Sequence, residues 1–88
     1  MALLEFYGKE CPHCERMNPL IEKLEKEERV SVKKYETWHD EENAKLFNDT
    51  VEDRCPGVPF FLNTDSDQFI CGEADYETVK KWAEGGKV

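Results

Sequence analysis

The sequence predicts an α/β fold in which one four-stranded mixed sheet carries helices on both faces. Two observations lead to this prediction. A strand pattern, an amphipathic helical pattern and a second strand pattern follow one another at the start, and such a unit gives a parallel strand pair with a right-handed crossover. Later, two short strand patterns joined by a polar connection predict a hairpin that adds antiparallel strands to the same sheet. The expected order is strand, helix, strand, helix, strand, strand, helix.

The first half of the chain holds two strand patterns around one helix. Residues 2–7 are apolar except for Glu5, which indicates a largely buried strand. The helix that follows extends to about residue 28, and Pro19 is expected to kink it without ending it, because the apolar spacing continues beyond. Residues 30–35 form the second strand. The apolar residues at helical spacing are Met17, Leu20, Ile21 and Leu24.

The second half holds a helix, a hairpin and a last helix. Asp40 caps the first of these helices and Asp75 the second, because an aspartate accepts hydrogen bonds from the free N–H groups of a first turn. Gly85 and Gly86 end the last helix. The predicted bounds are 40–48 for the first helix and 60–62 and 68–72 for the hairpin strands.

Two cysteines separated by two residues stand where the first strand gives way to the helix. Such a dithiol closes to a disulfide and reopens, which is redox chemistry. Cys11 is the predicted nucleophile, since unpaired N–H groups and the helix dipole favour a thiolate there. Cys14, one turn further, is the predicted resolving thiol. Pro12 suits a first helical turn, and His13 adds a titratable cation that tunes the thiolate.

Zinc binding and a structural disulfide are the alternatives for this pair. Structural zinc normally takes four ligands, whereas Cys55, Cys71 and His39 are scattered singly along the chain. A structural disulfide across so small a ring is unusual in a chain whose sequence begins without an export signal. We therefore predict catalytic redox use and no metal.

Length and charge limit the classes of partner. The 88 residues suffice for one domain, residues 1–88, and the net charge of −8 disfavours nucleic acid and anionic membranes. Apolar runs are too short to span a bilayer. We expect a cytoplasmic monomer.

The stretch from Phe6 to Leu24, with both cysteines and Pro19, resembles the active-site strand and helix of the thioredoxin superfamily. Val58 and Pro59 resemble the loop of that family in which a cis proline lies against the cysteines. The resemblance implies a compact thioredoxin fold of glutaredoxin size and a cis bond, with a trans proline at a strand start as the alternative. An extended substrate would then pair with the backbone of Val58. The predicted substrate-binding residues are Val58, Pro59, Pro12 and Gly72.

Glu5 stands six residues before Cys11, where thioredoxins carry a buried acid beneath the dithiol. A carboxyl on an apolar strand is costly unless it is paired or functional, so Glu5 is a candidate for proton transfer when Cys14 attacks. The alternative is a Glu5 that faces solvent or pairs with Lys33 or Lys34.

Residues 58–63 and 70–75 resemble, in part, the proline strand and the glycine-rich turn of glutaredoxins. Gly57, Cys71, Ala74 and Lys9 depart from that pattern, and each departure weakens a glutathione contact. The prediction is a thiol-disulfide oxidoreductase of protein disulfides, with a reductase or glutathione as electron donor and no bound cofactor. The alternatives are a glutathione-dependent glutaredoxin and a non-catalytic redox-sensing or partner-binding module. Cys-Pro-His-Cys is also found in a bacterial periplasmic disulfide oxidase whose inserted helical domain is missing here, so the direction of electron flow stays open.

Cys55 and Cys71 flank the predicted proline strand and its hairpin partner. We expect two small buried residues, with a second disulfide or a regulatory thiol as the alternatives.

Overall fold

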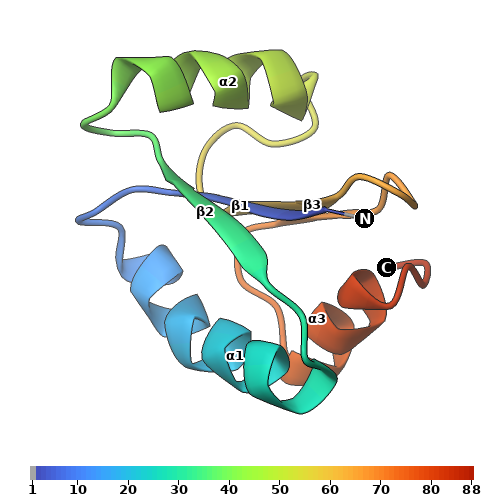
Figure 1. Cartoon of the computed structure of the whole chain (residues 1–88). Coiled ribbons are helices and arrows are strands. Elements are labelled where there is room, and N and C mark those ends of the chain that lie inside the picture. Colours follow the sequence, from blue (N-terminus) through green and yellow to red (C-terminus); the bar gives the residue numbers. More distant parts are fainter. Residues whose placement is uncertain (1) are drawn as a thin grey trace.

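A computed structural model describes residues 2–88 and contains seven elements in the predicted order. Figure 1 shows a sheet with α2 on one face and with α1 and α3 on the other. The strand order is β2-β1-β3-β4, and β1 pairs in parallel with β2 and antiparallel with β3. The predicted α/β fold with a mixed four-stranded sheet is therefore confirmed. The elements are β1 (Leu3–Tyr7), α1 (Pro12–Glu28), β2 (Val32–Glu36), α2 (Glu41–Val51), β3 (Phe60–Asn63), β4 (Phe69–Cys71) and α3 (Tyr76–Ala83).

Helix α1 forms as its sequence predicts. Cys11 is the N-cap, with extended backbone angles of φ −80° and ψ 112°, and Pro12 occupies the first turn. Pro19 lies inside the helix, which continues beyond it until Arg29 takes a left-handed conformation with φ 54°. The helix buries one stripe of side chains against the sheet, namely Cys14, Met17, Ile21 and Leu24.

The two faces of the sheet hold separate apolar clusters. On the face covered by α1 and α3, Phe61 meets Trp82 edge-on at 5.7 Å between ring centroids. On the α2 face, Phe6 and Phe60 pack with Phe47, and Phe6 lies 5.4 Å from Phe47 between centroids. Because side chains alternate along a strand, neighbouring residues of β1 and β3 supply both clusters.

Two boundaries differ from the prediction. Helix α2 continues to Val51 rather than ending near residue 48, because Val51 is buried and the polar residues before it do not interrupt the helix. The second strand begins at Val32 rather than at residue 30, after the left-handed Arg29 has ended α1. The described residues include no helix long and apolar enough to cross a membrane.

Candidate active site

The start of α1 brings Cys11 and Cys14 together. Both are free and each is only 2% exposed. The backbone N–H of Cys14 donates to Cys11 Sγ at 3.2 Å, and Cys11 N–H donates to the carbonyl of Gly8 at 3.1 Å. The N-cap position places the Cys11 sulfur at the end of the helix where unpaired N–H groups and the positive end of the dipole lie. Cys11 therefore has the surroundings of a nucleophile.

Cys14 lies in a different environment. Burial, followed by the contact with the Cys11 side chain, raises the pKa of Cys14 to about 12. At neutral pH Cys14 accordingly keeps its proton. The two sulfurs are thus chemically distinct, although only one helical turn separates them.

Glu5 lies on the α1 side of the sheet and is 1% exposed. Burial raises the pKa of Glu5 to about 7; the charge of Lys34 opposes this shift and that of Glu25 adds to it. Glu5 faces Lys34 across the parallel pair, yet Lys34 Nζ donates to Glu25 at 3.2 Å, and Glu5 Oε1 has no hydrogen-bond partner among residues 2–88. The carboxyl is therefore buried and incompletely paired.

A cavity of about 240 Å³ joins Glu5 to the surface. Its lining includes the exposed residues Asn18, Glu22 and Lys34. A carboxyl with a pKa near neutrality and a polar path outward is able to exchange protons with solvent.

His13 contacts the turn that follows β4. Its Nδ1 lies 2.5 Å from Glu73 Oε2, and Arg16 Nε lies 3.0 Å from Glu73 Oε1. A contact this short to a carboxylate requires a proton on Nδ1, so Nδ1–H donates to Glu73, and the nearby Arg16 Nη2 does not donate to that nitrogen. Hydrogen bonds from Arg16 and then His13 lower the pKa of Glu73 to about 2. Glu73 therefore joins the active-site helix to the hairpin end.

The predicted substrate loop lies against the first cysteine. Cys11 Sγ is 3.9 Å from the carbonyl oxygen of Val58, and the Val58–Pro59 bond is cis, as expected. Gly72 N–H donates to the carbonyl of Pro59 at 2.8 Å, and Gly72 has φ 90°, a conformation that side chains disfavour. The structure thus places Val58, Pro59 and Gly72 along one edge of the site, while Pro12 is exposed beside Cys11.

Cys55 and Cys71 form a disulfide with a Cα–Cα distance of 5.5 Å. The expectation of two small buried residues is therefore wrong: Cys55 is buried but Cys71 is exposed, and the two are bonded. The hairpin pattern placed both near Pro59, but bonding depends on a distance that the sequence does not contain.

Contacts that were not predicted from the sequence hold the loop before Cys11. The ring of Trp38 lies so close to Gly8 that a Cβ there would come within 2.2 Å of it. Glu36 Oε2 accepts the N–H of Lys9 at 2.8 Å, and His39 Nε2 lies 2.6 Å from Glu10 Oε1. The sequence signal was Gly8 itself, since a glycine beside a redox motif permits close approach.

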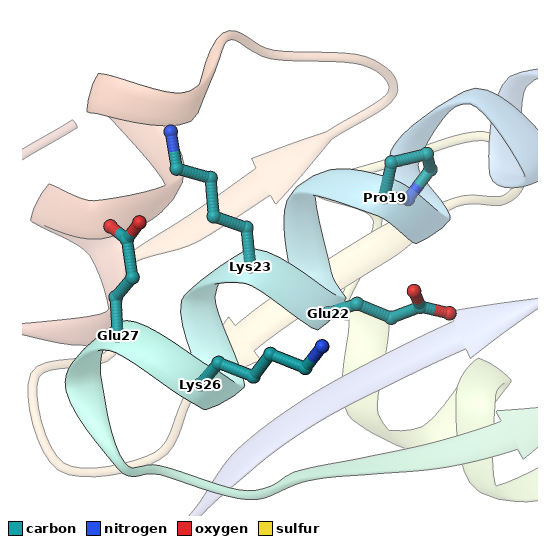
Figure 2. A pocket seen from close by; sticks show the side chains of 5 residues that line it. All are labelled: Pro19, Glu22, Lys23, Lys26 and Glu27. Carbon is teal, nitrogen blue, oxygen red and sulfur yellow. The ribbon is translucent and has the colours of Figure 1, made fainter.

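A larger hollow of about 390 Å³ lies along α1 (Figure 2). Pro19 and four charged side chains line it, and neither Cys11 nor Cys14 does. Two of the lining residues also contact α3: Lys23 Nζ lies 4.3 Å from the Tyr76 ring centroid, and Tyr76 OH donates to Glu27 at 2.9 Å. This hollow is therefore a feature of helix packing, separate from the dithiol. Within residues 2–88, no group of three or more His, Cys, Asp or Glu side chains is arranged to hold a metal ion.

Comparisons with known proteins agree with this fold. The chain is similar to a glutaredoxin, grx-1, from Archaeoglobus fulgidus, whose crystal structure matches with a TM-score of 0.69 and 22% identity over 94% of this chain and 87% of that one. A comparison with curated protein sequences gave no match. The family model named Thioredoxin matches residues 1–85, and the chain therefore belongs to the thioredoxin family.

Proposed function

We propose that this protein is a thiol-disulfide oxidoreductase that acts on protein disulfides through Cys11 and Cys14. The observation that carries the proposal is the difference between the two sulfurs. Cys11 Sγ receives the N–H of Cys14 at the helix start, whereas Cys14 is buried with a pKa of about 12. One thiol is suited to attack and the other to wait with its proton.

The reaction proceeds by two exchanges. The Cys11 thiolate attacks a substrate sulfur and forms a mixed disulfide, while the substrate disulfide breaks and its other sulfur leaves as a thiolate that takes a proton. Cys14 then loses its proton and attacks Cys11 Sγ, which releases the second substrate thiol. Two electrons have passed to the substrate, and the protein holds a Cys11–Cys14 disulfide.

Glu5 is the proposed acceptor of the Cys14 proton. Its pKa of about 7 lets it hold or release a proton near neutral pH, and its charge acts on Cys14. The polar cavity beside it supplies a route for that proton to leave. Glu5 thereby lowers the barrier to release of the mixed disulfide.

The substrate lies along Val58 as an extended segment. The 3.9 Å between Cys11 Sγ and the Val58 carbonyl puts that backbone within reach of a segment attached to Cys11. Pro12 and Gly72 flank the segment, and His13, held by Glu73, tunes the thiolate. No bound cofactor is needed, because the dithiol itself carries the electrons.

Reduced protein is regenerated by a reductase or by glutathione, and we propose that it works as a cytoplasmic monomer. Glutathione as the dedicated substrate is less well supported. Its two carboxylates gain little from a chain with a net charge of −8.

The test is the reduction of insulin disulfides by wild-type protein, Cys11→Ser and Cys14→Ser. We expect Cys11→Ser to lower the rate to that of the uncatalysed reaction. If Cys11→Ser reduced insulin as fast as wild type, the proposed enzymatic function would be contradicted and the partner-binding module would be the remaining interpretation. A glutathionylated peptide separates the remaining alternative: if Cys14→Ser keeps full activity on it while wild-type protein leaves insulin untouched, the protein is a glutathione-dependent glutaredoxin.

A further inference from the structure

The Cys55–Cys71 disulfide has no part in the proposed reaction, yet it adjoins the substrate loop. Cys55 precedes Val58 by three residues. Cys71 ends β4, where it lies opposite Phe60, and the next residue, Gly72, donates its N–H to the carbonyl of Pro59. The bond thus fastens the start of the substrate loop to the hairpin strand that supports its end.

One of the two half-cystines is open to attack. Strand β4 is at the edge of the sheet, and Cys71 is an exposed residue on it. Cys55 is 7% exposed and packs with the apolar cluster of the α2 face. A thiolate from solvent therefore approaches from the Cys71 side, and Cys55 is the leaving group.

Cleavage of this bond would make the loop more mobile without unfolding the domain. On one side, Arg54 Nη2 and Nε donate to the carbonyls of Thr50 and Val51 at 3.0 and 3.1 Å. On the other side, Pro59 is held by Gly72 and is buried. A neutral Cys55 thiol suits the apolar cluster around it. The segment between these anchors, residues 55–58, would gain freedom, and it contains Val58.

We propose that Cys55–Cys71 is a second redox site, a reversible disulfide reduced by a dithiol, and that its state controls how well Val58 binds a substrate segment. The control of substrate binding rests on the proposed function, whereas the reversible reduction of Cys55–Cys71 does not. It also agrees with the proposed compartment, because disulfides in a reducing cytoplasm are mostly transient or redox-sensing.

The chemistry balances with a dithiol as the reductant. Its first thiolate attacks Cys71 Sγ and forms a mixed disulfide, while the Cys55–Cys71 bond breaks and Cys55 takes a proton from solvent. Its second thiol displaces Cys71 and closes the reductant's own disulfide. Two electrons and two protons are transferred, and a disulfide compound drives the reverse reaction.

The first experiment isolates the second pair. A Cys11→Ser/Cys14→Ser variant is titrated with dithiothreitol, free thiols are alkylated and counted by mass, and circular dichroism follows the helices. We expect two thiols per chain to appear while the helical signal is unchanged. A bond that resists reduction until the helical signal is lost would be a structural disulfide, and the inference would be wrong.

The second experiment tests control of binding. We expect a Cys55→Ser/Cys71→Ser variant to raise the KM for insulin by roughly 3- to 10-fold, because the loop must then be ordered on binding, with kcat unchanged. The reduction potential of the Cys11/Cys14 pair should not move. An unchanged KM in a catalytically active variant would overturn the control of binding and leave the proposed function intact. Inactive wild-type protein would overturn the proposed function, while thiol counting would still decide whether the second pair is redox-active.

Discussion

The two cysteine pairs of this protein differ in sequence separation, in bonding and in surroundings. Cys11 and Cys14 lie within one helical turn and are free, whereas Cys55 and Cys71 are 16 residues apart and bonded. In the chain-entropy model, a cross-link that closes a loop of about 15 residues stabilises a fold by about 3 kcal/mol, and one that closes a single helical turn stabilises it by about 2 kcal/mol. Opening and closing the first pair therefore changes the stability of the fold less than opening and closing the second pair does.

Their electrostatic surroundings differ as well. The first pair has a helix N-terminus on one side and the buried carboxyl of Glu5 on the other. The second joins a loop to an edge strand, next to apolar side chains. Surroundings of the first kind suit the proton transfer that we propose, and those of the second kind suit a cross-link between two segments.

The largest expected effect is the trapping of a covalent substrate adduct, which distinguishes the first cysteine pair from the second. In Cys14→Ser the mixed disulfide on Cys11 has no resolving thiol, so we expect insulin turnover to stop and a covalent substrate adduct to accumulate. Intact mass spectrometry measures the adduct. Cys71→Ser is the matched control, since it also leaves one partner thiol, and it should form no such adduct on Cys55. An adduct on Cys55 of that control would mean that both pairs act as nucleophiles.

Glu5→Gln should both slow the reaction and remove a pH dependence of stability. In the folded state the pKa of Glu5 is about 7, against an ordinary value of 4.5. Between these two pH values the folded protein therefore binds more protons than the unfolded chain does. Wild-type stability therefore falls as pH rises from 4.5 to 7, by on the order of 3 kcal/mol from this group, and stays lower above pH 7. In urea unfolding, the free energy of unfolding of Glu5→Gln should rise relative to that of wild type as the pH increases over this interval. A constant difference would contradict the raised pKa.

The same substitution tests the proton role. We expect Glu5→Gln to slow insulin reduction at neutral pH by roughly 10²-fold, because Cys14 loses its acceptor. Pre-steady-state trapping should show mixed disulfide accumulating, as formation precedes the slowed step. An unchanged rate would leave Glu5 as a buried carboxyl without a catalytic role.

Removal of each pair should affect stability differently. We expect Cys55→Ser/Cys71→Ser to lower the free energy of unfolding by about 2–3 kcal/mol relative to the oxidised wild type. Cys11→Ser/Cys14→Ser, measured against the same fully oxidised wild type, should lower it by about 1 kcal/mol less, because the lost cross-link closes a loop of only a few residues. Urea titration of both variants gives the comparison. Similar losses in the two variants would contradict the role assigned to loop length.

Features that depend on neighbouring residues were predicted from the sequence more fully than features that depend on distant ones. The start of α1 follows from Cys11 and Pro12, and the order of elements follows from apolar periodicity, so both were predicted. The burial of Glu5 was one of two interpretations that its strand allowed. Its unpaired oxygen depends on Lys34 donating to Glu25, and a strand pattern does not predict which partner Lys34 takes.

Features that join distant segments were not predictable. The Cys55–Cys71 bond depends on a Cα–Cα distance of 5.5 Å between segments 16 residues apart, and the contact of His13 with Glu73 spans 60 residues. The disulfide joins a loop to an edge strand and the His13–Glu73 contact joins a helix start to a turn, and the sequence patterns predict such elements without the distances between them.

The smallest expected effect concerns the helix that follows Cys71. Asp75 caps α3, its Oδ1 accepting the N–H of Thr78 at 2.9 Å. We expect Asp75→Ala to lower Tm by roughly 4–8 °C, as loss of a cap does in a domain of this size. The drop should be the same in wild type and in Cys55→Ser/Cys71→Ser, because the cap does not contact the disulfide and independent sites add. If the drop were much larger without the disulfide, the turn between β4 and α3 would depend on the cross-link, and reduction of the second pair would loosen a helix as well as the substrate loop.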